Sequence, residues 1–205
     1  MTINEPKPNG WLTNIATDDI NNVYFLRVKL VDGTPNSELP IAGDTGGIAV
    51  SVTEHTACID VTPVLTVHAT YVANDFVGTT NTAMTFANCA RVNGGTGTVI
   101  GVVLVDFALQ SIAGELWLFD TAPAGLPADS APFTITDADA ARCIGVIPFS
   151  TYFASVLNSV SPVGNLTFAF QCLPASRSLY GAFVTRGAPA YASGDLTFRL
   201  RVLQD

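Results

Sequence analysis

The residues best suited to chemistry in this sequence are a histidine, a cysteine and an aspartate close together, His55, Cys58 and Asp60. Imidazole nitrogens, thiolates and carboxylates are the usual zinc ligands, and a structural site takes four of them at characteristic spacings. The other histidine, His68, lies within an expected strand, and no second Cys/His pair has ligand spacing. The pattern therefore predicts no structural zinc site, and His68 is expected to be a half-buried strand residue.

A second candidate is a group of carboxylates, in which Asp137 and Asp139 follow Asp120 and Asp129 of a preceding loop. Ca²⁺ takes several such hard oxygen ligands from loops. However, Asp139 is followed by two alanines where an EF-hand loop needs its glycine and a later acid. Acidic residues in the first turn of a helix are also favoured by the helix dipole. We therefore expect Thr136 to cap a short helix, with no metal and no cofactor.

Nucleophilic catalysis needs a serine or cysteine next to an activating base. The sequence contains no Gly-x-Ser-x-Gly elbow, and Ser130, Ser150 and Ser178 have no histidine nearby in the chain. The glycines of residues 95–101 resemble a phosphate-binding loop, but their spacing differs and a β-type run follows them instead of a helix. The sequence therefore predicts a protein that is not an enzyme.

The composition limits the partners that the chain can have. Only 13% of its 205 residues are charged and 48% are hydrophobic, while the net charge is −8. Nucleic-acid binding needs a basic surface that this balance does not provide, and no apolar run reaches membrane length. Apolar contacts between subunits are the economical explanation, and a surface of uncharged Thr, Ser, Asn and Gly is the alternative. The four cysteines have no clustered spacing and are expected to be buried free thiols of a protein made in a reducing cytoplasm.

The elements that must position all these residues are organised around Thr96–Asp120. Its first half is apolar on both alternating faces and rich in β-branched residues, which is typical of a strand covered on both sides. A turn at Ser111–Gly114 is followed by a second strand with Trp117 and Phe119 on one face. The stretch is therefore expected to form a central hairpin or to cross from one sheet to another.

Short strands separated by Gly/Pro turns make up most of the rest. The last of them, Leu196–Leu203, alternates apolar and polar residues with a period of two. The other expected strands span residues 23–31, 48–53, 61–71, 83–86, 144–149, 152–157, 165–172 and 179–185. Together they predict an all-β, two-sheet antiparallel sandwich, jelly-roll-like, with one short helix near 136–142.

The chain is expected to divide into an extended N-terminal arm, residues 1–22, and a single β-sandwich domain, residues 23–205. The arm lacks a sustained apolar period and the pattern of a secretory signal. Its Trp11 either anchors in a neighbouring surface or packs on its own domain. Exposed tyrosines can bind carbohydrate, although core or interface packing is their commoner use. The interface candidates are Trp11, Leu12, Ile15, Tyr152 and Tyr191.

From about Thr96 onward the chain resembles a group of virion-associated proteins of tailed bacteriophages. The resemblance rests on residues 115–123 (ELWLFDTAP), 133–147 (FTITDADAARCIGVI) and 179–191 (LYGAFVTRGAPAY), and on the final stretch 193–205 (SGDLTFRLRVLQD). It covers roughly half to two-thirds of the chain, and residues 1 to about 60 lie outside it. No catalytic residue is carried over by these motifs.

The resemblance implies a structural role on the phage head, as a cement or decoration protein on the outer surface of the capsid. The implied partners are other copies of the chain, as a homotrimer at local three-fold axes, and the major capsid protein. The low charge, the acidic balance and an N-terminal arm able to reach a neighbour suit this role. The alternative is a receptor- or glycan-binding head fibre or tail module, which would be present in far fewer copies per virion.

Overall fold

The computed structural model of this protein describes residues 17–20, 23–26, 55–66 and 70–205. The chain divides into two units, Met1–Val52 and Thr53–Asp205. The described part of the first unit is a pair of antiparallel strands, β1 (Thr17–Ile20) and β2 (Val23–Leu26), in which Ile20 pairs with Val23.

The unit boundary differs from the expected one after residue 22. Val23–Leu26 was expected to begin the sandwich, but it pairs with β1 in a two-stranded sheet of its own. Pairing between neighbouring segments closes only a short loop, which costs little chain entropy. The expected strand at 48–53 and the interface candidates Trp11, Leu12 and Ile15 lie outside the described residues.

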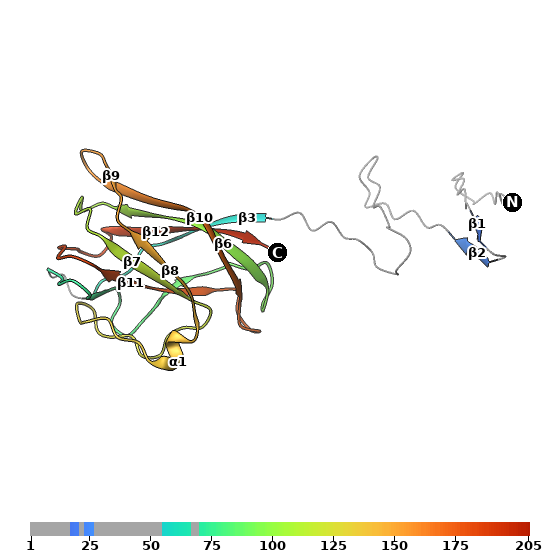
Figure 1. Cartoon of the computed structure of the whole chain (residues 1–205), viewed down its shortest axis with the longest axis horizontal. Coiled ribbons are helices and arrows are strands. Elements are labelled where there is room, and N and C mark those ends of the chain that lie inside the picture. The colour runs from blue at the N-terminus through green and yellow to red at the C-terminus, as the bar shows by residue number, and fades with distance from the viewer. Residues whose placement is uncertain (1–16, 21–22, 27–54, 67–69) are drawn as a thin grey trace, which may run out of the picture. The chain divides into compact units, whose positions relative to one another are not determined.

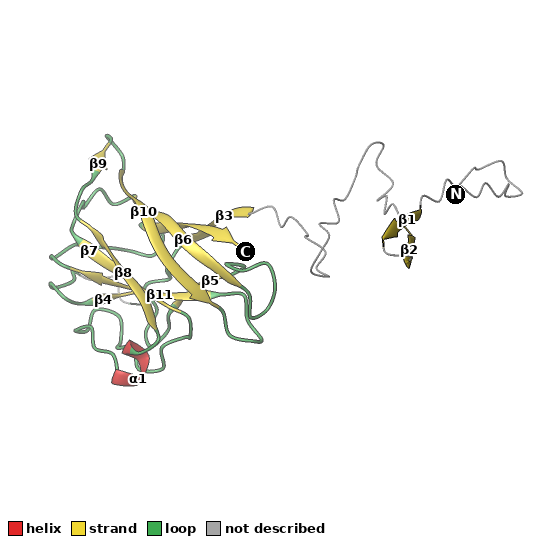
Figure 2. Cartoon of the chain, turned by 45° about the vertical axis from the view of Figure 1, so that its right-hand side comes forward, coloured by secondary structure: helices red, strands yellow, loops and turns green. Residues whose placement is uncertain are grey.

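The second unit consists of two antiparallel sheets, so the prediction of an all-β, two-sheet sandwich is confirmed (Figures 1 and 2). The first sheet has the order β3 (His55–Val61), β12 (Leu196–Gln204), β6 (Thr96–Asp106), β10 (Ser159–Gln171), β9 (Phe153–Ala154). The second sheet has the order β4 (Phe76–Val77), β11 (Leu179–Thr185), β7 (Gly114–Phe119), β8 (Cys143–Phe149), and β5 (Met84–Phe86) also pairs with β11.

The central stretch crosses between the two sheets, since β6 belongs to the first sheet and β7 to the second. β6 lies between β12 and β10, and Val99, Val102 and Leu104 on its inner face are fully buried. In β12, Leu196, Phe198, Leu200 and Val202 are also buried, as their alternation predicts.

Three phenylalanine rings join the two sheets across the core. Phe198 of the first sheet lies 5.1 Å from Phe183 and 6.1 Å from Phe149 of the second, measured between ring centroids. Phe149 and Phe183 are themselves 6.2 Å apart. Gly114 at the start of β7 leaves room for this cluster, because a Cβ there would lie 2.4 Å from the Phe183 ring.

The short helix α1 (Asp137–Ala140) lies between β7 and β8, outside both sheets (Figure 2). Its cap is as predicted: the Thr136 hydroxyl accepts a hydrogen bond from the Asp139 amide at 3.1 Å. The Asp139 carboxylate in turn accepts bonds from the amides of Ala124 and Gly125, at 3.0 and 3.1 Å. These bonds, led by that from Ala124, hold the pKa of Asp139 below its usual range.

The expected long strand over 61–71 is wrong for residues 62–66. The strand β3 instead begins at His55 and ends at Val61, and it includes residues that were expected to be irregular. Proline has no amide hydrogen for a ladder, so Pro63 ends the pairing. Two residues after Pro63, the amide of Leu65 donates a hydrogen bond to the Ser193 hydroxyl at 2.8 Å. His68 lies outside the described residues.

The phenylalanine cluster predicts a large cost for removing one ring. Replacing Phe198 with alanine should lower the free energy of unfolding by about 3–5 kcal/mol, because the ring is fully buried between the sheets. Urea denaturation followed by circular dichroism measures this. The matched change Val92→Ala, at a side chain 63% exposed, should cost less than about 0.5 kcal/mol. Equal effects of the two changes would contradict the assignment of the core.

Candidate interaction surface

Five large apolar side chains are exposed on two neighbouring connections of the sandwich. They are Phe107 (51% exposed) and Leu109 (40%) between β6 and β7, with Phe153 (63%), Val156 (89%) and Leu157 (79%) in and after β9. We call these five residues the apolar end. Single exposed apolar residues are ordinary on a soluble protein, whereas a large contiguous group of them is typical of a contact surface, so we treat the apolar end as the candidate.

The strand register places the two connections at the same end of the sandwich. Ser159 at the beginning of β10 pairs with Asp106 at the end of β6, so both connections leave from this point. The hydroxyls of Ser111 and Ser159 are hydrogen-bonded at 3.0 Å. The Tyr152 hydroxyl donates to the Ile112 carbonyl at 2.6 Å. The two connections are therefore tied to each other at their bases.

Several backbone groups of the two connections are hydrogen-bonded within the connections themselves. The buried Asp106 carboxylate accepts bonds from the amides of Ala108 and Ser111, at 3.0 and 2.7 Å. At the tip between β9 and β10, the Ser155 amide donates to the Asn158 carbonyl at 2.7 Å. With their backbones held in this way, the connections present their apolar side chains outward on a built scaffold.

Few charged side chains lie beside the apolar end; one is Asp195, whose carbonyl accepts a hydrogen bond from the Phe107 amide at 2.7 Å and whose carboxylate has no cationic partner among the described residues. No residue from Cys143 to Ser176, which include β8, β9 and β10, is charged. Asp106 is fully buried, and Glu115 forms an ion pair with Arg186. A surface with few charged side chains costs little free energy to dehydrate, which favours contact with another protein surface.

The structure separates the interface candidates that the sequence suggested. Tyr191 is only 3% exposed and packs against Tyr71, with 6.3 Å between ring centroids, so its assignment to an interface is corrected to the core. Burial raises the pKa of its phenol. Tyr152 is half-buried, and its hydroxyl is used to hold the base of the apolar end. The five residues of the apolar end were not found from the sequence, because they read there as ordinary strand residues.

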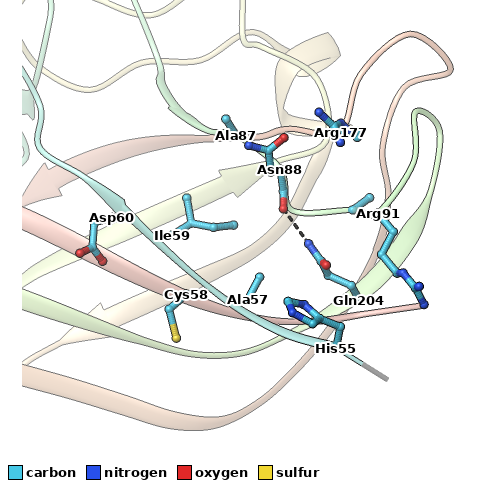
Figure 3. Close-up of a pocket in the computed structure, with 11 residues that line it drawn as sticks. His55, Ala57, Cys58, Ile59, Asp60, Ala87, Asn88, Arg91, Arg177 and Gln204 are labelled. Carbon is cyan, nitrogen blue, oxygen red and sulfur yellow. Dashed lines mark hydrogen bonds between the residues drawn. The ribbon is translucent and has the colours of Figure 1, made fainter. Parts of the chain in front are cut away.

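The candidate zinc ligands do not come together. Alternation along β3 points the side chains of His55 and Cys58 to opposite faces (Figure 3). The Asp60 carboxylate is held by Arg199, at 2.8 Å from Nε to Oδ1 and 2.7 Å from Nη2 to Oδ2. Among the described residues, no group of three His, Cys, Asp or Glu side chains could hold a metal ion.

The other carboxylates are also dispersed. Asp120 pairs with Arg142 at 2.8 Å, and the buried Asp129 accepts a hydrogen bond from the Tyr71 hydroxyl at 2.9 Å. All four cysteines are free thiols, but Cys58 is exposed and Cys143 half-buried, so burial holds fully only for the other two. Burial raises the pKa of the Cys89 thiol to about 12, which keeps it protonated and unreactive.

Comparison of the chain with protein-family models, with curated proteins and with solved structures returns no match. Within the described residues, no helix is long and apolar enough to cross a membrane.

The ion pair beside the apolar end predicts a pH dependence of stability. The hydrogen bond from Arg186 is the main cause that holds the pKa of Glu115 below its usual value of 4.5, and desolvation opposes it. A carboxylate with a lowered folded pKa stabilises the fold above its unfolded pKa, and this stability is lost as the pH falls through the folded value. Below pH 4.5, Glu115→Gln should therefore lose less stability than the parent protein in urea denaturation. Identical losses would show that the pair contributes nothing.

Proposed function

We propose that the protein is a non-enzymatic structural subunit of a tailed-phage virion, a capsid cement or decoration protein that bridges major capsid subunits on the outer surface of the head. The observation that carries the proposal is the apolar end, a contact surface on a rigid sandwich. The phage-like motifs add to it, since residues 115–123 include all of β7 except Gly114 and residues 179–191 contain β11, and β7 and β11 are the central pair of the second sheet.

The occupant of the apolar end, in this proposal, is a second copy of the chain. Each copy has a net charge of −8, so two copies approach most easily through a surface that carries few charged side chains. Interfaces between identical subunits are also the most apolar class of protein contact. Three copies that meet through their apolar ends form a closed trimer and leave the other surfaces free for the capsid.

The strand order supports the jelly-roll form of the sandwich. In the first sheet, β3 and β6 alternate with β12 and β10, and in the second sheet β4 and β7 alternate with β11 and β8. A jelly roll, which consists of two interleaved Greek keys, requires strands from early in the chain to alternate in this way with strands from later in the chain. Jelly rolls occur in both viral capsid proteins and lectins, so this form agrees with the proposal without selecting it.

A protein of this kind stabilises the head by binding only to its assembled form. Binding to one state and not to the other shifts the equilibrium towards the bound state by mass action. The acidic balance fits the outer surface, because the protein is not attracted to the packaged DNA.

The alternative is a receptor- or glycan-binding head fibre or tail module. A hollow of about 500 Å³ offers Asn93, Asp120, Arg142 and Gln171 as hydrogen-bonding groups for a sugar. Its lining among the described residues contains no aromatic ring on which a sugar could stack. Copy number in the virion separates the two functions: hundreds of copies per particle favour cement, and about a dozen or fewer favour a fibre.

The apolar end predicts a trimer that a single charge can disrupt. In light scattering coupled to gel filtration, the parent protein should have the mass of three chains and Val156→Asp the mass of one, because like charges would be brought together at the contact. The circular dichroism spectrum should not change, since Val156 is 89% exposed. Val92→Asp, at a similarly exposed side chain away from the apolar end, should remain a trimer. A parent protein that is monomeric would contradict self-association.

The proposed role also predicts binding to capsids. Purified protein should co-sediment with expanded heads that lack it and should raise the temperature at which those heads break open. Unexpanded heads serve as the control and should bind at least tenfold less, if expansion creates the binding sites. Failure to bind expanded heads while remaining trimeric would reject the cement role and leave the fibre role.

A further inference from the structure

A hollow of about 710 Å³ lies along β3, at the side of the first sheet opposite β9 (Figure 3). β3 forms one wall from His55 to Asp60, and residues 87–91 form the other. At about 3.3 Å per residue the β3 wall is roughly 17 Å long, which suits an extended chain better than a small molecule.

The far wall of this hollow carries two arginines, Arg91 and Arg177. Both are exposed, and neither has a carboxylate partner among the described residues. By contrast, Arg142, Arg186 and Arg199 are each paired with an acid. In a chain of net charge −8, the hollow is thus a local site of unneutralised positive charge.

Hydrogen bonds fix the arginine-bearing segments in place. The Arg177 carbonyl accepts bonds from the amides of Cys89 and Ala90, at 2.7 and 3.2 Å, so the two segments lie side by side. The Gln204 side chain donates to the Asn88 carbonyl at 2.7 Å and connects this wall to β12 (Figure 3). The two guanidinium groups therefore project from a braced surface.

The opposite wall offers backbone groups. Among the described strands, β3 pairs only with β12, so alternate residues of β3 have amide and carbonyl groups at a free edge. Asp60, the acid in the lining, is already bound by two nitrogens of Arg199 and does not neutralise the hollow.

We propose that this groove binds an extended acidic segment of a partner protein, which adds to β3 as a further antiparallel or parallel strand. Its backbone would bond to the free edge of β3, and its carboxylates would pair with Arg91 and Arg177. Strand addition supplies affinity through main-chain bonds, and the paired charges supply the preference for an acidic segment. This inference does not require the virion role.

The test uses the full-length protein and a short fluorescein-labelled peptide that alternates valine with glutamate. In fluorescence polarisation the parent protein should bind it, and the double variant Arg91→Gln/Arg177→Gln should bind at least tenfold more weakly. Arg201→Gln is the matched control, because Arg201 also lacks an acidic partner among the described residues but does not line the hollow. It should bind within about twofold of the parent.

Two further probes separate strand addition from simple charge attraction. Methylating every second backbone amide keeps the charge of the peptide and gives two variants, depending on which set of amides is methylated. The variant whose methylated amides would face β3 cannot extend the sheet and should lose at least tenfold in affinity. Citrate at the same carboxylate concentration should not displace the labelled peptide. The proposal is overturned if the parent does not bind the peptide, if the arginine variant binds equally well, if methylation has no effect, or if citrate competes.

Discussion

The contact on which the rest of this structure depends is the packing of phenylalanines between the two sheets. Each sheet has one apolar face that needs cover, and Phe198 supplies the ring that meets Phe149 and Phe183 of the opposite sheet. This contact determines the position of one sheet relative to the other. The positions of the sheets in turn determine where each connecting loop begins and ends. The apolar end and the β3 groove both lie at borders of this packed core, so their geometry follows from it.

Three acidic side chains stabilise loops around that core. Asp106 and Asp139 accept hydrogen bonds from backbone amides of their own connections, and the buried Asp129 accepts the bond of the Tyr71 hydroxyl. A buried carboxylate is stable only when such donors surround it. These acids lie apart from one another, and each is explained by the loop that it holds. Each of these three carboxylates therefore has a role in holding its own loop, which the geometry accounts for without a ligand.

Sequence reasoning was most successful where a local rule determines the outcome. The period of two identified β12, and the capping pattern at Thr136 identified the helix to within a few residues. It could not decide whether residues 96–120 form a hairpin, because alternation shows that a strand has two faces but not which sheet it joins. The same limit hid the apolar end and misplaced Tyr191. Val156 and Tyr191 both lie in loops of the structure, although Val156 was expected in a strand. Only the long-range packing of those loops decides that Val156 is exposed and Tyr191 buried.

The two borders of the first sheet differ in a way that allows two contacts at once. The border at β9 is short and adjoins an apolar surface with few charged side chains, whereas the border at β3 is longer and faces two arginines. An apolar contact and a charged strand-addition contact select different partners, since each partner would bind the other surface with a less favourable free energy. Gln204 of the hollow pairs with Gly97 near the start of β6, whereas the apolar end adjoins Asp106 at the end of β6, so the two surfaces lie towards opposite ends of that strand. The two proposals are compatible with each other, because the proposed self-contact and the proposed strand addition would use different surfaces, and both together would suit a protein that bridges subunits.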